Sequence, residues 1–283
     1  MKISLMISVY NRLDLLHKSL LSIARQKRLP DEVILTDDGS DADIVSFYLE
    51  HVSLIPVPFH LVRQEHAGFR LARLRNNGVH VSTGDLLMFL DQDIIISEEY
   101  IQKFEQSVTP NRFFVSYPIR LSKEQSEQIT DEVIHQNTIP LLLTGKQRNK
   151  PVKQYRKDRL NLLLYKMHLA QYGAKLRGGV CAIRRQDYLN VNGYDENFIG
   201  WGNEDDDMSR RLLATGVIGL NVTKQEYSYH LYHEPNNSGG IRVNKEYAGK
   251  AMLKIKSGDF RCEKGLDSER NDLQIWKNGQ PIQ

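Results

Sequence analysis

Cysteine is scarce in this chain, and its scarcity excludes two kinds of structure. The 283 residues contain only Cys181 and Cys262. Two cysteines are too few for the disulfide framework of a small secreted domain, and they show no zinc-site spacing. Cys181 also stands in the apolar segment 180–183, where a thiol behaves as a small hydrophobic side chain. A chain of this length can instead bury one generous hydrophobic core or two small ones.

Long apolar runs and a large net charge are also missing. No segment reaches the roughly 18 apolar residues that span a bilayer, and the apolar start at 1–9 is too short for a signal peptide. We therefore expect a cytoplasmic protein, at most peripheral to the inner face of a membrane. The net charge of +3 is too small to indicate a nucleic-acid ligand, and none is expected.

One stretch departs from this balanced charge. Between residues 146 and 177 there are ten Lys or Arg residues and a single acid, Asp158. A run of charge is most often a solvated surface segment. The alternative is a patch for peripheral contact with an anionic membrane or with a polyanionic acceptor.

Two common nucleotide-binding signatures are absent. The sequence contains neither G-x-G-x-x-G, which holds a dinucleotide, nor the G-x-x-x-x-G-K-[ST] phosphate loop. A phosphate-bearing ligand would therefore need a metal ion or arginines to balance its charge.

Strand and helix patterns alternate over the first hundred residues. We expect strands at 3–9, 33–35, 59–62 and 86–90, and helices at 13–24 and 71–81, the first capped by Asn11. This alternation predicts a mostly parallel sheet flanked by helices. Ligands bind such sheets at the carboxyl ends of the strands, so the polar residues that follow three of these strands should converge. These are Tyr10 and Asn11, Asp37 and Asp38, and Asp91 to Asp93.

The remaining chain is less regular. We expect helices at 123–136, 160–171, 208–214 and from Arg185, a loop at 146–157, a strand at 178–183 and a β-prone stretch at 226–233. The polar tail after about residue 236 has no assigned structure.

Two groups of residues are candidate metal ligands. Asp91 and Asp93 flank a turn after a hydrophobic strand, and hard cations such as Mg²⁺ or Mn²⁺ prefer oxygen ligands that they can share with a diphosphate. The alternative is that both carboxylates merely cap the turn. His230 and His233 can complete a Mn²⁺ shell, although a histidine among tyrosines is more often a hydrogen-bonded core residue.

The segment Trp201 to Asp207 carries the strongest signal. Four consecutive acids follow a Gly-Trp-Gly turn and precede a predicted helix. The helix dipole favours acids in a first turn by about 0.3–1 kcal/mol each, and Asp207 can pair with Arg211. Those effects explain one or two acids but not four beside a tryptophan. A carboxylate in a sugar-sized pocket can deprotonate a hydroxyl, and an aromatic ring gives a pyranose a face to stack on.

With these pieces in order, the chain resembles the inverting GT-A-fold glycosyltransferases of family 2. Its C-terminal half is similar to the domain shared by β-1,4-galactosyltransferases, polypeptide N-acetylgalactosaminyltransferases and bacterial chondroitin-type polymerases. The resemblance covers about residues 3–118 and 177–235. It implies a GT-A catalytic domain over 1–235, with a nucleotide-sugar half at 1–118, a variable helical insertion at 119–176 and an acceptor half at 177–235. Residues 236–283 form a tail of unassigned packing.

The resemblance also implies roles for individual residues. Positions that match the nucleotide site are Val9, Tyr10, Asn11, Arg12, Asp38, Arg75, Asn76, Asp91 and Gln92. Asp93 is the expected metal ligand, with His233 the first histidine and His230 or Asp91 the alternatives. Asp205 is the expected general base. Trp201, Gly202, Glu204, Asp206 and Gly179 are expected to bind the donor and acceptor sugars.

The activity implied is transfer, with inversion, of a hexose or N-acetylhexosamine from a UDP-sugar to a hydroxyl of a glycan or glycolipid acceptor, in polysaccharide or glycolipid synthesis. The resemblance favours galactose or N-acetylgalactosamine as the transferred sugar, and Mn²⁺ over Mg²⁺ as the metal. Two departures matter: Asn203 replaces a glycine of the galactosyltransferase motif, and residues 119–176 match nothing in it. A carbohydrate-binding module without activity and a nucleotide-sugar hydrolase are the alternatives.

Overall fold

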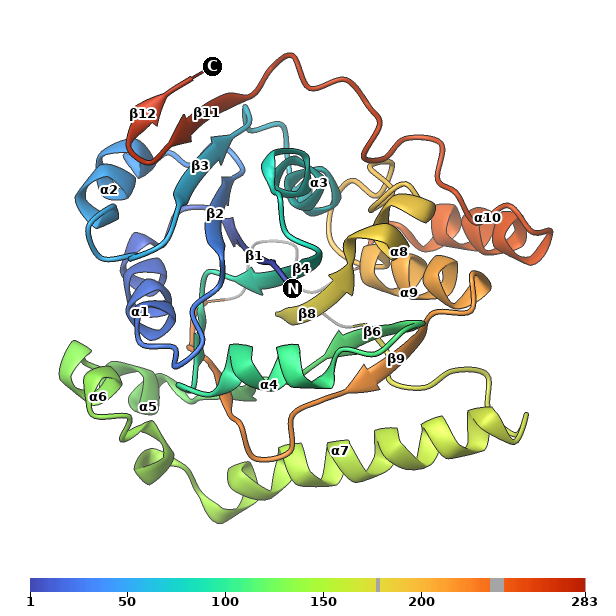
Figure 1. Ribbon diagram of the computed structural model, residues 1–283, viewed down its shortest axis with the longest axis horizontal. Helices are drawn as coiled ribbons and strands as arrows, with labels where there is room; N and C mark the ends of the chain where they lie inside the picture. Colours follow the sequence, from blue (N-terminus) through green and yellow to red (C-terminus); the bar gives the residue numbers. More distant parts are fainter. Residues whose placement is uncertain (177–178, 235–241, 283) are drawn as a thin grey trace.

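A large sheet runs through the molecule with helices on both of its faces (Figure 1). The computed structural model describes residues 1–176, 179–234 and 242–282. The sheet has nine strands in the order β12-β11-β3-β2-β1-β4-β8-β6-β9. A second sheet has three strands in the order β5-β10-β7. Among the described residues, no helix combines the length and the apolar character needed to cross a membrane.

The centre of the large sheet is parallel, as predicted. Its four parallel strands are β3 (Phe59–Arg63), β2 (Glu32–Asp37), β1 (Ile3–Val9) and β4 (Leu86–Asp91). The flanking strands are β8 (Val180–Arg184), β6 (Arg112–Val115) and β9 (Ile218–Asn221) on one side, and β11 (Gln274–Lys277) and β12 (Gln280–Pro281) on the other. Strand β8 is antiparallel to both of its neighbours, and β11 is antiparallel to β3.

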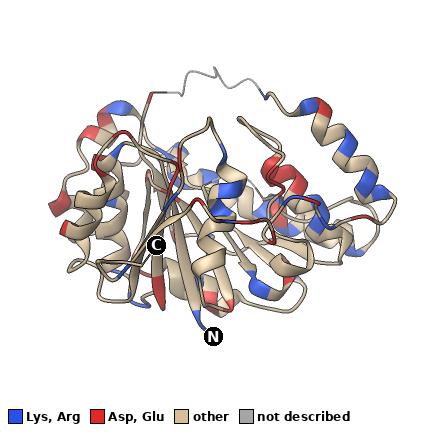
Figure 2. Cartoon of the chain, turned by 90° about the horizontal axis from the view of Figure 1, so that it is seen from above, with Lys and Arg blue, Asp and Glu red and all other residues tan. Residues whose placement is uncertain are grey.

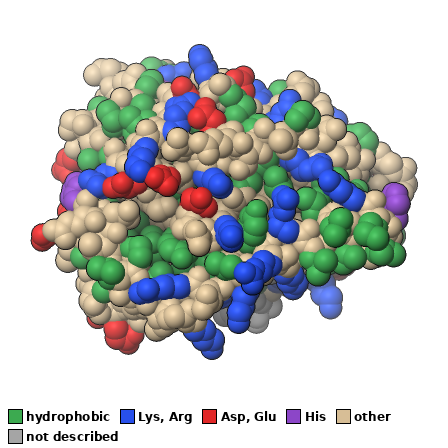
Figure 3. Space-filling model, turned by 60° about the horizontal axis from the view of Figure 1, so that its bottom comes forward, with side chains coloured by type: hydrophobic (Ala, Val, Ile, Leu, Met, Phe, Trp, Pro, Cys, Tyr) green, Lys and Arg blue, Asp and Glu red, His purple; other side chains and the backbone are tan. Residues whose placement is uncertain are grey.

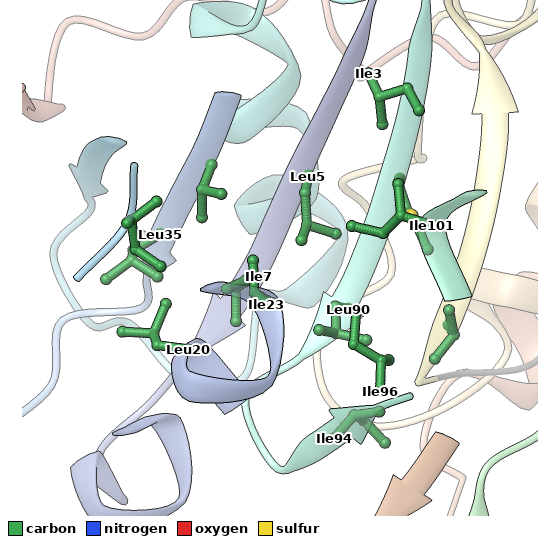
Figure 4. Close-up of a cluster of buried hydrophobic side chains, with 14 of the residues drawn as sticks. Ile3, Leu5, Ile7, Leu20, Ile23, Leu35, Leu90, Ile94, Ile96 and Ile101 are labelled. Carbon is green, nitrogen blue, oxygen red and sulfur yellow. The ribbon is translucent and has the colours of Figure 1, made fainter. Parts of the chain in front are cut away.

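Alternating side chains of the central strands supply two hydrophobic cores, because successive residues of a strand point to opposite faces. On one face, Ile3, Leu5 and Ile7 of β1 pack with Leu20 and Ile23 of the first helix (Figure 4). The helices on this face are α1 (Leu13–Ala24), α2 (Ile44–His51) and α4 (Tyr100–Ser107). The helices on the other face are α3 (Leu71–Val81), α8 (Arg185–Asn190) and α9 (Glu204–Ala214).

The small sheet and its helices enclose a third cluster of buried hydrophobic side chains. Its strands are β5 (Ile94–Ile96), β10 (Ser228–His230) and β7 (Ile119–Arg120). The predicted helix at 123–136 is two short helices, α5 (Lys123–Glu127) and α6 (Asp131–His135), followed by the 3₁₀ turn η1 (Ile139–Leu142). The break falls at Thr130, whose hydroxyl accepts a hydrogen bond from the Val133 amide and so starts a new helix.

Two local predictions are wrong. Residues 146–157 do not form a loop, since they lie in the 22-residue helix α7 (Gly145–Lys166). A capping box between Thr144 and Gln147 starts this helix, and its Lys, Arg and Gln residues favour it, although Pro151 lies inside it. Asn11 does not cap α1. The capping position is Arg12, in the left-handed region at φ 53°, and the Asn11 side chain instead accepts hydrogen bonds from two amides of the loop after β2.

The tail is an ordered part of the fold where it is described. It forms α10 (Lys245–Lys256) and then crosses the molecule to add β11 and β12 to the edge of the sheet at β3. On the way, Arg270 pairs with Glu196 at 2.5 Å, and both side chains are 2% exposed. The tail thereby joins the parallel strands to the half of the chain that carries α9.

Candidate active site

The carboxyl ends of three parallel strands meet at one edge of the large sheet, as the sequence predicted. Val9 of β1 lies beside Asp37 of β2, and Ser8 lies beside Asp91 of β4. Gln92 holds two of these ends together, because its side-chain amide accepts a hydrogen bond from the Tyr10 amide and donates one to the Tyr10 carbonyl, each at 3.0 Å. The structure thus places Tyr10 and Gln92 next to each other. The side-chain amide of Gln92, however, is used to link the end of β1 to the residues that follow β4.

A polar recess lies beside the ends of β1 and β2. The Asp38 side chain is buried and accepts a hydrogen bond from Gln64, and burial raises its pKa despite that bond. His66 stacks on Tyr10 with 4.6 Å between the ring centroids, and both rings are partly exposed. Gly39 lets the backbone after β3 lie close to the turn after β2, because a Cβ at its φ of +68° would lie 2.4 Å from the His66 backbone nitrogen. The buried Asp38 carboxyl can form hydrogen bonds, and the stacked rings of Tyr10 and His66 offer a flat surface. Together they suit a ligand with a planar ring that forms hydrogen bonds.

Asp93, His230 and His233 form a cluster of potential metal ligands. One ligand atom from each lies within 4.8 Å of the others. Nε2 of His233 is 3.1 Å from Asp93 Oδ2, and Nε2 of His230 is 3.8 Å from Oδ1. The sheet positions these groups, since β10 pairs with β5 just after Asp93. Arg12 Nη1 also approaches Asp93, at 3.8 Å.

The hydrogen bonds of this cluster fit a cation at its centre. Nδ1 of His230 and Nδ1 of His233 lie 2.9 and 2.8 Å from backbone carbonyl oxygens, which can only accept. Each Nδ1 therefore carries a proton, and a neutral ring then directs the lone pair of Nε2 at the Asp93 carboxylate. Two acceptors facing one another need a proton or a metal ion between them. Asp93 Oδ1 is also buried without a hydrogen-bond partner among the described residues.

Without a metal ion, the pKa values of Asp93 and His233 shift as expected for a carboxylate and an imidazole that share a proton. Burial opposes the charge on Asp93, but the His233 hydrogen bond and the nearby cations outweigh it and lower the pKa of the carboxyl. The same hydrogen bond raises the pKa of His233. Asp91 differs, because burial outweighs the attraction of Arg75 and raises its pKa to about 6.

Arg75 lies beneath the site and connects its two halves. The guanidinium is 2% exposed, with Nη1 2.7 Å from Asp205 Oδ1 and 3.0 Å from the Tyr194 hydroxyl. Its Nη2 is 3.7 Å from Asp91 Oδ1. A buried arginine between two carboxylates balances their charge. The expected contact of Arg75 with a nucleotide is therefore corrected to a supporting position under Asp91 and Asp205.

Asn76 is also corrected from the predicted nucleotide-binding role. Its side chain is fully buried, and its amide group donates to the Tyr194 carbonyl and to Glu196. Its oxygen accepts from the Tyr188 hydroxyl and from the Tyr194 amide. All the hydrogen bonds that the side chain can make are used inside the protein, so none is left for a ligand. Asn76 instead fixes the position of Tyr194.

The four consecutive acids occupy the first turn of α9 (Figure 2). Asp207 and Arg211 form the predicted pair at 2.7 Å, and the structure buries it. Asp206 pairs at 3.1 Å with the exposed Arg242. Asp205 lies in the site, where its Oδ1 accepts from Arg75 and from the Tyr194 hydroxyl. Glu204 is buried, and its Oε2 has no hydrogen-bond partner among the described residues.

Burial, together with repulsion by Asp205, raises the pKa of Glu204 from 4.5 to about 7. The folded state therefore binds this proton more tightly than the unfolded state, and the stability contributed below pH 4.5 is lost as the pH rises through about 7. We expect Glu204→Gln to raise the free energy of unfolding at pH 8 by about 1–3 kcal/mol and to change it little at pH 4.5. Urea unfolding at both pH values, without metal or nucleotide, measures this. Glu263→Gln at an 87% exposed side chain is the control, and an equal effect at both pH values would contradict the assignment.

The residues expected to touch sugars border the same site. Trp201 is 40% exposed, and the Arg242 guanidinium lies 5.9 Å from its ring centroid. Gly202 has φ +100°, and a Cβ there would meet the Arg242 side chain at 2.8 Å. Gly179 has φ +101° and its carbonyl accepts from the Asp91 amide, so it lies beside the end of β4. Gly178, at the start of the predicted strand, lies outside the described residues, as does Arg177 of the basic segment.

Sequence reasoning missed several residues of the site. Tyr194 holds both Arg75 and Asp205, and its position just before the acidic segment was the available signal. Gln64 and His66 follow β3, and the sequence predicted no functional residue at the end of that strand. Arg242 lies in the unassigned tail, and nothing in the sequence connects it with Trp201.

The fold and the site define a class of protein. The chain has the GT-A fold of glycosyltransferases, and two solved structures support this. The structure of S. aureus TarS 1-349 in complex with UDP-GlcNAc is similar with a TM-score of 0.62 and 15% identity, over 93% of this chain and 68% of that chain. The structure of GalNAc-T7 with UDP, GalNAc and Mn²⁺ has a TM-score of 0.60 and 16% identity, over 92% of this chain and 50% of that chain.

Sequence comparison then shows the family. The model of glycosyl transferase family 2 matches residues 4–190, which is more than half of the chain, so the chain belongs to this family. A second model, the N-terminal domain of galactosyltransferase, matches residues 158–234.

Two relatives are distantly similar to this chain. Validoxylamine A glucosyltransferase of Streptomyces hygroscopicus subsp. limoneus is 26% identical over 84% of this chain and 53% of that protein. Chondroitin synthase of Escherichia coli is 27% identical over 81% of this chain and 34% of that protein. The chain therefore spans about half or less of the length of these two relatives.

Proposed function

We propose that this chain transfers a hexosyl or N-acetylhexosaminyl group from a UDP-sugar to an acceptor hydroxyl, in a metal-dependent reaction that inverts the anomeric carbon. The observation that carries the proposal is the placement of Asp205. Its carboxylate lies at the start of α9, linked through the buried Arg75 to Asp91 at the end of β4. A group that can accept a proton therefore lies beside the strand ends where family members bind nucleotide-sugars.

The nucleotide would lie along the ends of β1, β2 and β4. The exposed Tyr10–His66 pair offers an aromatic face to the base, and the buried Asp38 carboxyl offers hydrogen bonds. UDP-GlcNAc in the TarS structure and UDP in the GalNAc-T7 structure support a uridine nucleotide in this fold.

Asp93, His230 and His233 would hold a divalent metal, with Mn²⁺ favoured by the mixture of nitrogen and oxygen ligands. When bound, the metal supplies positive charge for the donor diphosphate and for the departing UDP. The chain's own part is to orient the two imidazoles through their Nδ1 hydrogen bonds. Arg12 adds a fixed positive charge at the edge of this site.

Loss of His233 should weaken metal binding. We expect His233→Ala to raise the dissociation constant for Mn²⁺ at least about tenfold, because losing even a supporting hydrogen bond costs a metal site that much. Electron paramagnetic resonance of free Mn²⁺ measures the binding. His168→Ala, at an exposed histidine just beyond α7, is the matched control. Full transfer activity in excess EDTA would contradict the metal's role.

Asp205 would remove the proton from the attacking acceptor hydroxyl. Its Oδ1 is occupied by Arg75 and Tyr194, which leaves Oδ2 for the acceptor. Glu204 and Asp206 flank it and would hold sugar hydroxyls, while Trp201 would stack on a sugar ring. The attacking hydroxyl and the leaving UDP then lie on opposite sides of the anomeric carbon, which gives inversion.

The donor and acceptor are open to a direct screen. UDP release is measured with Mn²⁺ over the common UDP-sugars, each with and without a panel of sugar acceptors. We expect release that depends on the acceptor, with UDP-galactose or UDP-N-acetylgalactosamine as donor. Release at the full rate without acceptor would identify a hydrolase, and no release with any donor would favour a binding module.

A further inference from the structure

Helix α7 turns hydrophobic side chains outward. Two of its side chains are buried, Asp158 and Leu162, and their spacing of four residues defines the side that faces the protein. The opposite side carries Leu160 and Leu163, which are both 54% exposed. Met167, just past the end of the helix, lies on the same side and is 56% exposed. Spacing of three and four residues places them in one stripe. The helix also buries an apolar side chain on its inward side, Leu162, so the outward stripe is additional apolar surface that the protein itself does not cover.

The same helix is strongly basic. It carries eight Lys or Arg residues, and its one acid, Asp158, is 5% exposed. The eight are Lys146, Arg148, Lys150, Lys153, Arg156, Lys157, Arg159 and Lys166. No ion pair with an acid is found for any of them among the described residues. The outward surface of α7 therefore combines uncompensated positive charge with an apolar stripe.

Figure 3 brings this side of the molecule forward, which is the lower side in Figure 1, where α7 lies. Lys and Arg side chains lie there beside hydrophobic ones. Leu169, just past the helix, is 68% exposed and extends the apolar surface. A solvated helix would explain the charge, but it gives no reason for the exposed leucines. An apolar stripe bordered by cations is the pattern of a helix that lies in a lipid interface.

We propose that α7 docks this protein on an anionic lipid surface. The cations would meet the headgroups, and Leu160, Leu163 and Met167 would enter the boundary with the acyl chains. Charge complementarity favours lipid over a second copy of this chain, because two α7 surfaces would bring eight cations against eight. The proposal stands apart from the transfer reaction, since none of these residues belongs to the candidate active site.

Vesicle flotation tests the proposal on the full chain. We expect it to float with phosphatidylcholine vesicles that contain phosphatidylglycerol, and to remain behind with phosphatidylcholine alone or in high salt. Lys153→Gln and Arg156→Gln should each weaken the partition coefficient roughly fivefold. The double variant Leu163→Glu/Met167→Glu should abolish flotation at low salt.

Leu253→Glu is the matched control, because Leu253 is 64% exposed on α10, another helix with several lysines. It should float like the parent protein. Circular dichroism and thermal melting establish that every variant is folded. The proposal is overturned if the parent does not float with anionic vesicles, or if the Leu163/Met167 variant floats as well as the parent. It is also overturned if light scattering shows a dimer that this variant dissociates while vesicle binding is unchanged.

Discussion

Replacing Asp205 with asparagine is expected to lower kcat for sugar transfer by about 10²–10⁴-fold, the usual contribution of a general base. Asparagine keeps the shape of the side chain and can still accept the hydrogen bonds that Arg75 and Tyr194 donate to Oδ1. It cannot take a proton from the acceptor. UDP should still bind in the presence of Mn²⁺, because the residues proposed to hold the nucleotide and the metal are unchanged and lie outside α9.

Steady-state transfer kinetics and a separate UDP titration measure these two effects. Asp259→Asn, the same chemical change at an exposed aspartate, is the control and should keep full activity. Near-normal turnover by Asp205→Asn would rule out Asp205 as the base. Glu204 would then be the alternative, because its pKa of about 7 also suits a proton acceptor.

The parts of this fold that repeat a local pattern could be predicted from the sequence. Strands β1 to β4 each combine an apolar run with a turn or polar end, and parallel topology then requires that their ends share an edge. The convergence of Tyr10, Asp38 and Asp91 follows from those two facts alone. The pairing of Asp207 with Arg211 was likewise predictable, because it depends only on helical spacing, but its burial was not.

Other features depend on contacts between distant segments, and no local pattern predicts these. In the sequence, nothing distinguishes Arg75 from an ordinary helical arginine. Its role depends on contacts with Tyr194 and Asp205, which lie more than a hundred residues later in the chain. The tail has the polar composition of a loop, yet its strand β11 pairs with the edge strand β3. The first part of helix α7, residues 146–157, was predicted as a loop because it is mostly polar, contains Pro151 and shows no apolar stripe at helical spacing.

The network around Arg75 gives the second large expected effect. Replacing Arg75 with glutamine should lower the free energy of unfolding at pH 8 by about 3–5 kcal/mol, the range found when one partner of a buried ion pair is removed. Asp91 and Asp205 would then lose the buried cation between them. Urea unfolding measures the effect. Arg261→Gln, in a pair whose side chains are 51% and 56% exposed, should cost less than about 1 kcal/mol.

The pH dependence of this effect distinguishes lost charge balance from lost packing. Burial already raises the pKa of Asp91 from 3.8 to about 6 with Arg75 in place, and removing the cation raises it further. A carboxyl with a raised folded-state pKa contributes stability at low pH that is lost as the pH rises through that pKa. The penalty of Arg75→Gln should therefore shrink between pH 8 and pH 5, whereas a packing defect would cost the same at both. Arg75→Lys, which keeps the charge but not the planar fork, should fall between the parent and the glutamine variant at pH 8. If the glutamine and lysine variants were equally unstable at both pH values, the charge of Arg75 would not be what holds the two halves of the site together.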